Sequence, residues 1–87
     1  MFYQSQVQNM TEKDILQLVK KSLKTRQKID INSNSNNVEE WDSVGQLIIL
    51  SNLDTKLKGA TSNISAIATA NSIKKIIGIL KKNKLIK

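Results

Sequence analysis

The chain has 87 residues, with 14 Lys and Arg against 7 Asp and Glu, and it contains neither cysteine nor histidine. A chain of this length forms one small domain with a thin hydrophobic core. The lack of cysteine excludes disulfide scaffolds and thiolate metal sites, and the lack of histidine removes the usual general base, so we do not expect an enzyme.

Residues 1–10 precede the first predicted helix and are expected to form an N-terminal extension. They lack the basic start and the apolar stretch of a secretory signal peptide. No run in the chain approaches the roughly 18 apolar residues that a membrane span needs. We therefore expect a cytoplasmic monomer without a membrane span. Three glycines, no proline and apolar residues at helical spacing predict an all-α fold.

The first predicted helix covers residues 11–24. Thr11 and Asp14 have the spacing of a capping box, and the acid also favours the positive end of the helix dipole. The apolar residues of this segment form one stripe: Ile15, Leu18, Val19 and Leu23. The next stretch, "IDINSNSNNVEE", favours a long ordered loop, because Asn and Ser side chains compete with helical hydrogen bonds. Three apolar residues are expected to hold this loop to the core: Ile29, Ile31 and Val38.

The second predicted helix begins at Ser43 and ends at Gly59, a natural C-terminal stop. Its apolar residues are Val44, Leu47, Ile48, Ile49, Leu50, Leu53 and Leu57. They spread over most of the helix circumference, although a surface helix needs an apolar stripe only a little wider than about 100°. Either this helix is central in the bundle, or part of its surface meets a partner or ligand.

The C-terminal segments comprise a short helical turn around residues 64–68 and a last helix that Ser72 caps. One face of the last helix is apolar: Ile73, Ile76, Ile77 and Leu80. The chain from residue 56 onward carries eight lysines and no acid, whereas residues 1–55 are nearly neutral. A basic tail, residues 82–87, can bind phosphates, but almost no aromatic or arginine side chain is available to stack on bases. We expect a solvated tail in preference to a nucleic-acid contact.

Asp42 and Ser43 stand at the start of the second helix. Both are good N-cap residues, and Ser43 with Gln46 has the S-x-x-Q spacing of a capping box. A serine without a neighbouring base is not activated as a nucleophile. Local chemistry alone therefore favours a cap at Ser43.

The segment "EEWDSVGQLIIL" and the elements around it resemble the acyl carrier and peptidyl carrier proteins. These proteins carry a phosphopantetheine arm on the serine of an Asp-Ser-Leu motif that opens their second helix, and here the matching residues are Asp42, Ser43 and Val44. The resemblance covers roughly residues 11–81. With Trp41 directly before the motif, the segment resembles the discrete carriers of specialised pathways more than the main fatty-acid carrier.

The resemblance implies a four-helix bundle of acyl-carrier type, with a long loop between helices one and two and a short third helix. It implies 4′-phosphopantetheine attached to Ser43 by a separate transferase that brings coenzyme A and metal. The arm would hold an acyl or aminoacyl group as a thioester for loading and transferring enzymes of a biosynthetic pathway. Asp42, Val44 and Trp41 would contact partner proteins. Three leucines of helix two would face the core: Leu47, Leu50 and Leu53.

The sequence departs from the family at three points. Glu40 stands where a glycine usually precedes the motif, and Val44 replaces leucine. Carriers of this family present an acidic second helix to basic enzymes, but here Asp54 stands against Lys56 and Lys58. Because charge governs partner choice, this implies dedicated partners or largely apolar docking.

Two other functions stay open from the sequence. The chain could be a carrier-like interaction domain that is never modified. It could also be a small basic helical module that binds nucleic acid or an anionic membrane surface through "KKIIGILKKNKLIK".

Overall fold

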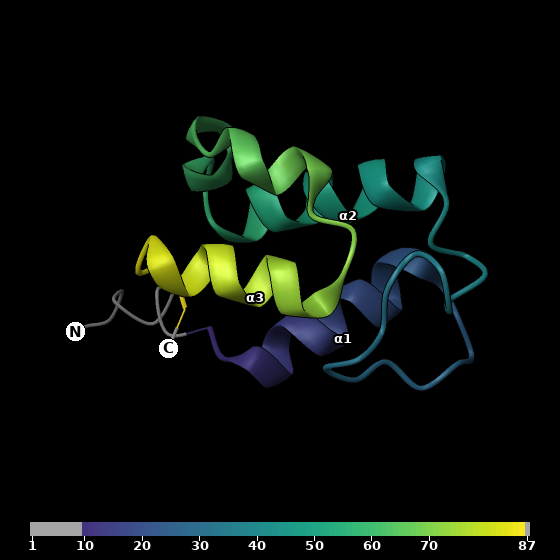
Figure 1. Ribbon diagram of the computed structural model, residues 1–87. Coiled ribbons are helices and arrows are strands. Elements are labelled where there is room, and N and C mark those ends of the chain that lie inside the picture. Colours follow the sequence, from purple (N-terminus) through teal and green to yellow (C-terminus); the bar gives the residue numbers. More distant parts are fainter. Residues whose placement is uncertain (1–9, 87) are drawn as a thin grey trace.

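The computed structural model describes residues 10–86 as a small all-helical domain, which confirms the predicted all-α class (Figure 1). Its helices are α1 (Glu12–Leu23), α2 (Ser43–Lys56) and α3 (Ile73–Lys82). Two 3₁₀ segments lie between α2 and α3: η2 (Ala60–Asn63) and η3 (Ser65–Thr69). The described residues form no strand, only one isolated bridge between Asn34 and Ser72. The predicted N-terminal extension lies outside the described residues except for Met10.

Helix α1 forms as predicted. The Thr11 hydroxyl accepts from the backbone N–H of Asp14 at 3.3 Å, and the Asp14 carboxylate accepts from the backbone N–H of Thr11 at 2.9 Å. This reciprocal capping box satisfies two donors that a helix start otherwise leaves without partners. The predicted apolar stripe is the buried face: Ile15, Leu18, Val19 and Leu23.

Helix α2 packs against α1, but only one narrow side of it is buried. The buried residues within the helix are Gly45, Ile49 and Leu53. Leu53 is therefore in the core as predicted, and Leu50 is half-buried against it. The prediction that Leu47 faces the core is wrong, because its side chain is 66% exposed. At about 100° per residue Leu47 points almost directly away from Ile49, so the two cannot share a buried face.

The short helical turn expected around residues 64–68 is present as the 3₁₀ segment η3, and a second 3₁₀ segment, η2, precedes it. Hydroxyl side chains bond to the backbone there: Ser62 donates to the Gly59 carbonyl at 2.7 Å and Thr69 to the Ala66 carbonyl at 3.3 Å. Such local bonds compete with the α-helical ladder and suit tighter, short turns. Helix α2 ends at Lys56, three residues before the stop predicted at Gly59, and the left-handed residues Lys58 (φ 55°) and Gly59 (φ 85°) turn the chain into η2.

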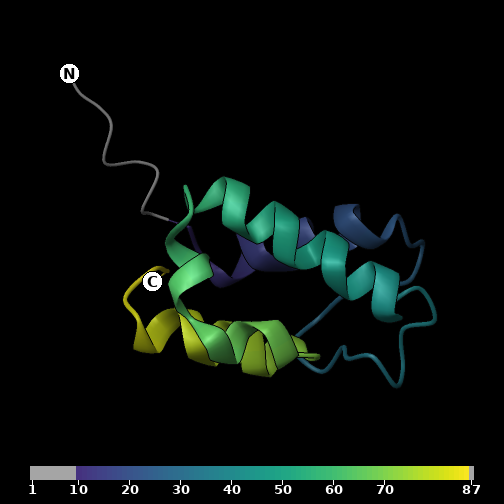
Figure 2. The same cartoon turned by 90° about the horizontal axis from the view of Figure 1, so that it is seen from above.

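Helix α3 closes the core. Ser72 caps it by accepting from the Lys75 N–H at 3.1 Å, and its predicted apolar face is buried. The loop between α1 and α2 docks onto the start of α3, where the Ile73 N–H donates to the Ser33 carbonyl at 3.0 Å. This loop lies at the end of the molecule opposite to the C-terminal end of α3 (Figures 1 and 2). Ile29 and Val38 are buried as predicted, but Ile31 is exposed.

The prediction of a solvated tail from residue 82 onward holds only in part over residues 82–86. Lys82 is the last residue of α3, and Ile86 is only 6% exposed within the hydrophobic core. The Leu85 N–H donates to the Leu80 carbonyl at 2.8 Å, which turns the chain back toward the helix. The lysines of this segment are exposed where the structure describes them, so only the charged side chains are solvated. No helix within residues 10–86 is long and apolar enough to cross a membrane.

Candidate functional site

Asp42 and Ser43 have different roles at the start of α2. Asp42 has an extended backbone, and its carboxylate accepts from the Gly45 N–H at 2.8 Å, so Asp42 is the N-cap. Ser43 is the first helical residue and its side chain is exposed. Within residues 10–86, no hydrogen bond engages the Ser43 hydroxyl. The predicted capping box between Ser43 and Gln46 is therefore not formed.

Gln46 instead ties the start of α2 to η3. Its side-chain oxygen accepts from the Trp41 indole N–H at 2.7 Å, and its amide nitrogen donates to the carbonyls of Ala68 at 3.2 Å and Ala70 at 3.1 Å. One amide thus satisfies a buried indole and two carbonyls at the end of η3, which holds the start of α2 in place. This role could not be predicted from the sequence, because a glutamine three residues after Ser43 is equally consistent with a capping box.

Trp41 lies in the core rather than at the surface. Only 2% of it is exposed, and it is the largest fully buried side chain among the described residues. Very little of its ring is therefore open to a partner, so the expected partner contact at Trp41 does not fit this conformation. Its position directly before Asp42 instead anchors the entry to α2.

A shallow hollow of about 340 Å³ opens beside Ser43, and we call it the serine hollow. Its lining residues are Ser35, Trp41, Asp42, Ser43, Gln46, Ala68, Thr69 and Asn71. The hollow lies between α2, η3 and the loop that connects α1 to α2. Most of its lining residues have hydroxyl or amide side chains. These groups can donate to and accept from a polar, amide-containing ligand.

The outward side of α2 beside Ser43 is apolar and uncharged. Val44 is 65% exposed and Ile48 is 42% exposed, and both lie near the exposed Leu47 at helical spacing. Ser51 and Thr55 continue the same side and are also exposed. We call these residues the α2 outer face: Val44, Leu47, Ile48, Ser51 and Thr55. The exposure of Val44 agrees with its expected place at a contact surface.

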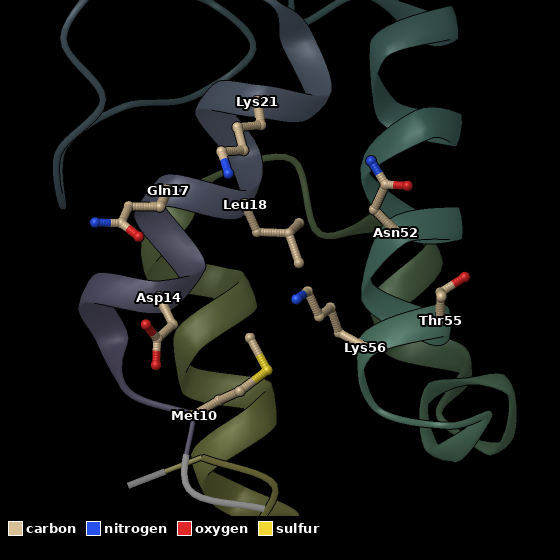
Figure 3. A pocket seen from close by; sticks show the side chains of 8 residues that line it. All are labelled: Met10, Asp14, Gln17, Leu18, Lys21, Asn52, Thr55 and Lys56. Carbon is tan, nitrogen blue, oxygen red and sulfur yellow. The ribbon is translucent and has the colours of Figure 1, made fainter. Parts of the chain in front are cut away.

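A larger groove of about 420 Å³ lies between α1 and the C-terminal half of α2 (Figure 3). Helix α1 contributes Asp14, Gln17, Leu18 and Lys21, and α2 contributes Asn52, Thr55 and Lys56. Asn52 follows Ser43 by nine residues, which places it about 14 Å farther along α2. The groove therefore does not include the candidate serine, and its charges are mixed.

The described residues contain no group of three or more acidic side chains that could hold a metal ion. Comparisons with protein-family models, with curated proteins and with solved structures found no match for this chain.

Proposed function

We propose that this protein is a discrete acyl or aminoacyl carrier of the cytoplasm, with 4′-phosphopantetheine attached to Ser43. The observation that carries the proposal is the exposed Ser43 hydroxyl, which no described group engages, on the first residue of a helix whose cap is supplied by Asp42. The carrier would be a monomer of acyl-carrier type, with η2 and η3 in the place of the short third helix. It would hold its cargo as a thioester for partner enzymes.

The division of roles between Asp42 and Ser43 supports this chemistry. Since Asp42 satisfies the helix start, the Ser43 oxygen can form a bond to phosphorus without loss of the cap. In the transfer, the nucleotide part of coenzyme A leaves and the hydroxyl proton passes to the transferase, so the carrier needs no base of its own. The first N–H groups of α2 have no acceptor within the helix and favour the negative charge of the resulting phosphodiester.

The α2 outer face supports docking that is largely apolar. The acid nearest its C-terminal end, Asp54, is half-buried and accepts from the Thr61 hydroxyl at 2.9 Å, which holds its carboxylate beside η2. An enzyme that recognises this side of α2 would therefore present apolar side chains rather than a strongly basic patch. Dedicated loading and transferring enzymes fit this surface better than partners selected by charge.

The first test is transfer of the arm in vitro. Incubation with coenzyme A and a broad-specificity phosphopantetheinyl transferase should add the mass of one phosphopantetheinyl group to the wild-type chain and none to Ser43→Ala. Because Asp42 supplies the cap, Ser43→Ala should remain folded by circular dichroism. A wild-type chain that several transferases leave unmodified, or a group that maps to another serine, would contradict the proposal.

The second prediction concerns Val44. Val44→Asp should leave the domain folded, because the valine side chain is largely exposed and no core methyl groups are lost. The added acid on the α2 outer face should slow transfer of the arm several-fold, measured as the rate of mass gain beside a thermal melt. Gln17→Asp is the matched control, since it adds one acid on an exposed position of α1. Equal rates of arm transfer for wild type and Val44→Asp would show that the transferase does not dock on the α2 outer face.

A further inference from the structure

A second hollow adjoins the serine hollow on the side of η3. It has a volume of about 400 Å³ and lies between η3 and α3, which pack against each other (Figure 2). We call it the lysine-rimmed hollow, and its lining residues are Ala66, Thr69, Ala70, Lys74, Lys75, Gly78, Ile79 and Lys82. Thr69 lines both hollows, so the two adjoin at this residue. Lys75 donates to the Asn71 side chain at 3.4 Å, and Asn71 also lines the serine hollow.

The lining of the lysine-rimmed hollow contains two kinds of residue. Alanine, glycine and isoleucine residues form its apolar part, which we call the floor, and three lysines form its charged part, which we call the rim. No acid lines the hollow. The one ion pair among the described residues joins Lys81 to Glu12, so none of the three rim lysines is paired with an acid there. An apolar chain of a few carbons that ends in an anion matches both parts of the surface.

We infer that the cargo of this carrier is an acyl group that ends in a carboxylate. The inference rests on the proposed attachment of the arm to Ser43. The amide-containing arm would cross the serine hollow, and the cargo would lie on the apolar floor between η3 and α3. The terminal carboxylate would meet Lys74, Lys75 and Lys82, whose positive charges have no competing acid at the rim. An acyl group without a carboxylate would gain only the contact with the floor.

Gly78 allows the hollow to be filled without disturbing the core. A Cβ placed on Gly78 meets no atom within 4 Å, and the residue lies on the exposed side of α3. Gly78→Leu therefore projects a side chain into the space that the cargo would occupy. Lys74→Gln with Lys82→Gln removes two rim charges while keeping hydrogen-bonding capacity. Lys20→Gln, which removes one positive charge from an exposed position of α1, is the control away from the hollow.

The experiment compares the arm-bearing chain with chains loaded with adipoyl or hexanoyl groups, which have six carbons each and differ in the terminal carboxylate. Intact mass first establishes that each sample carries the arm and its cargo, and NMR then records the backbone amide shifts. The adipoyl group should move the signals of Gly78 and Ile79 several-fold more than the hexanoyl group does. The difference should shrink with added salt, be lost in Gly78→Leu and in the double lysine variant, and persist in Lys20→Gln.

The outcomes separate the two proposals. A chain that gains no mass overturns the attachment at Ser43, and the cargo inference falls with it. A chain that carries the adipoyl group but shows no movement at Gly78 and Ile79, or shows the same movement with hexanoyl, overturns the cargo inference alone. Movement that persists in both the filled and the charge-removed variants also overturns it, because the contact would then lie elsewhere.

Discussion

Leu53→Ala is expected to destabilise the domain by about 2–5 kcal/mol, because the side chain is fully buried and its removal leaves a cavity in the core. Domains of this size have a total stability of only about 5–10 kcal/mol, so the variant should be partly unfolded near physiological temperature. Chemical denaturation followed by circular dichroism would measure the loss in free energy of unfolding.

Leu47→Ala is the matched control for this prediction. It removes the same atoms from the same helix, but from a side chain that is mostly exposed, so the expected change is within about 0.5 kcal/mol. Equal losses for Leu53→Ala and Leu47→Ala would show that α2 is rotated relative to the orientation described. The uncharged docking surface proposed on its outer face would then be lost.

Gly45→Ala is expected to destabilise the domain although it places a better helix former in α2. A Cβ at this position would overlap the Glu40 carbonyl oxygen and lie 2.6 Å from Leu23 Cδ2. Overpacking of this kind costs about 1–3 kcal/mol, which exceeds the gain of roughly 0.5–1 kcal/mol from replacing a helical glycine. Since the overlapping atom belongs to the backbone that leads into Asp42, the shift should also slow arm transfer to Ser43.

Gly78→Ala provides the control for this variant. Its Cβ would enter open space on α3, so the substitution should stabilise the domain by roughly 0.5–1 kcal/mol. Thermal melts of the two variants, beside their rates of mass gain with the transferase, test the prediction. A Gly45→Ala variant as stable as Gly78→Ala would mean that α1 and the Glu40 backbone do not approach α2 as closely as described.

Helices α1 and α3 could be predicted from sequence because each has a single apolar stripe and a capping side chain. The stripe fixes which side is buried, and Thr11 or Ser72 fixes where the helix begins. Helix α2 could be located but not oriented, because apolar residues surround it and the pattern does not distinguish Leu47 from Ile49. The choice depends on Gly45, whose missing side chain lets Leu23 approach.

The rest of the candidate site depends on long-range contacts that no local pattern specifies. The Gln46 side chain donates to the carbonyls of Ala68 and Ala70, which are more than twenty residues away in the chain. The same side chain accepts from the buried Trp41 indole, so the environment of Trp41 also depends on this long-range contact. The burial of Ile86 likewise depends on a turn after α3 rather than on the lysine-rich composition around it. The local sequence thus predicts that Ser43 lies at the start of a helix, but the contacts that hold this helix start are visible only in the tertiary structure.

The most direct test of the carrier proposal is the mass of the chain isolated from the cells that make it. The proposal predicts that a substantial fraction of the chain carries one phosphopantetheinyl group, with or without cargo, and that fragmentation places the group on Ser43. A chain that accumulates without any such group, in cells that modify other carriers, would contradict the proposal and would favour an unmodified interaction domain.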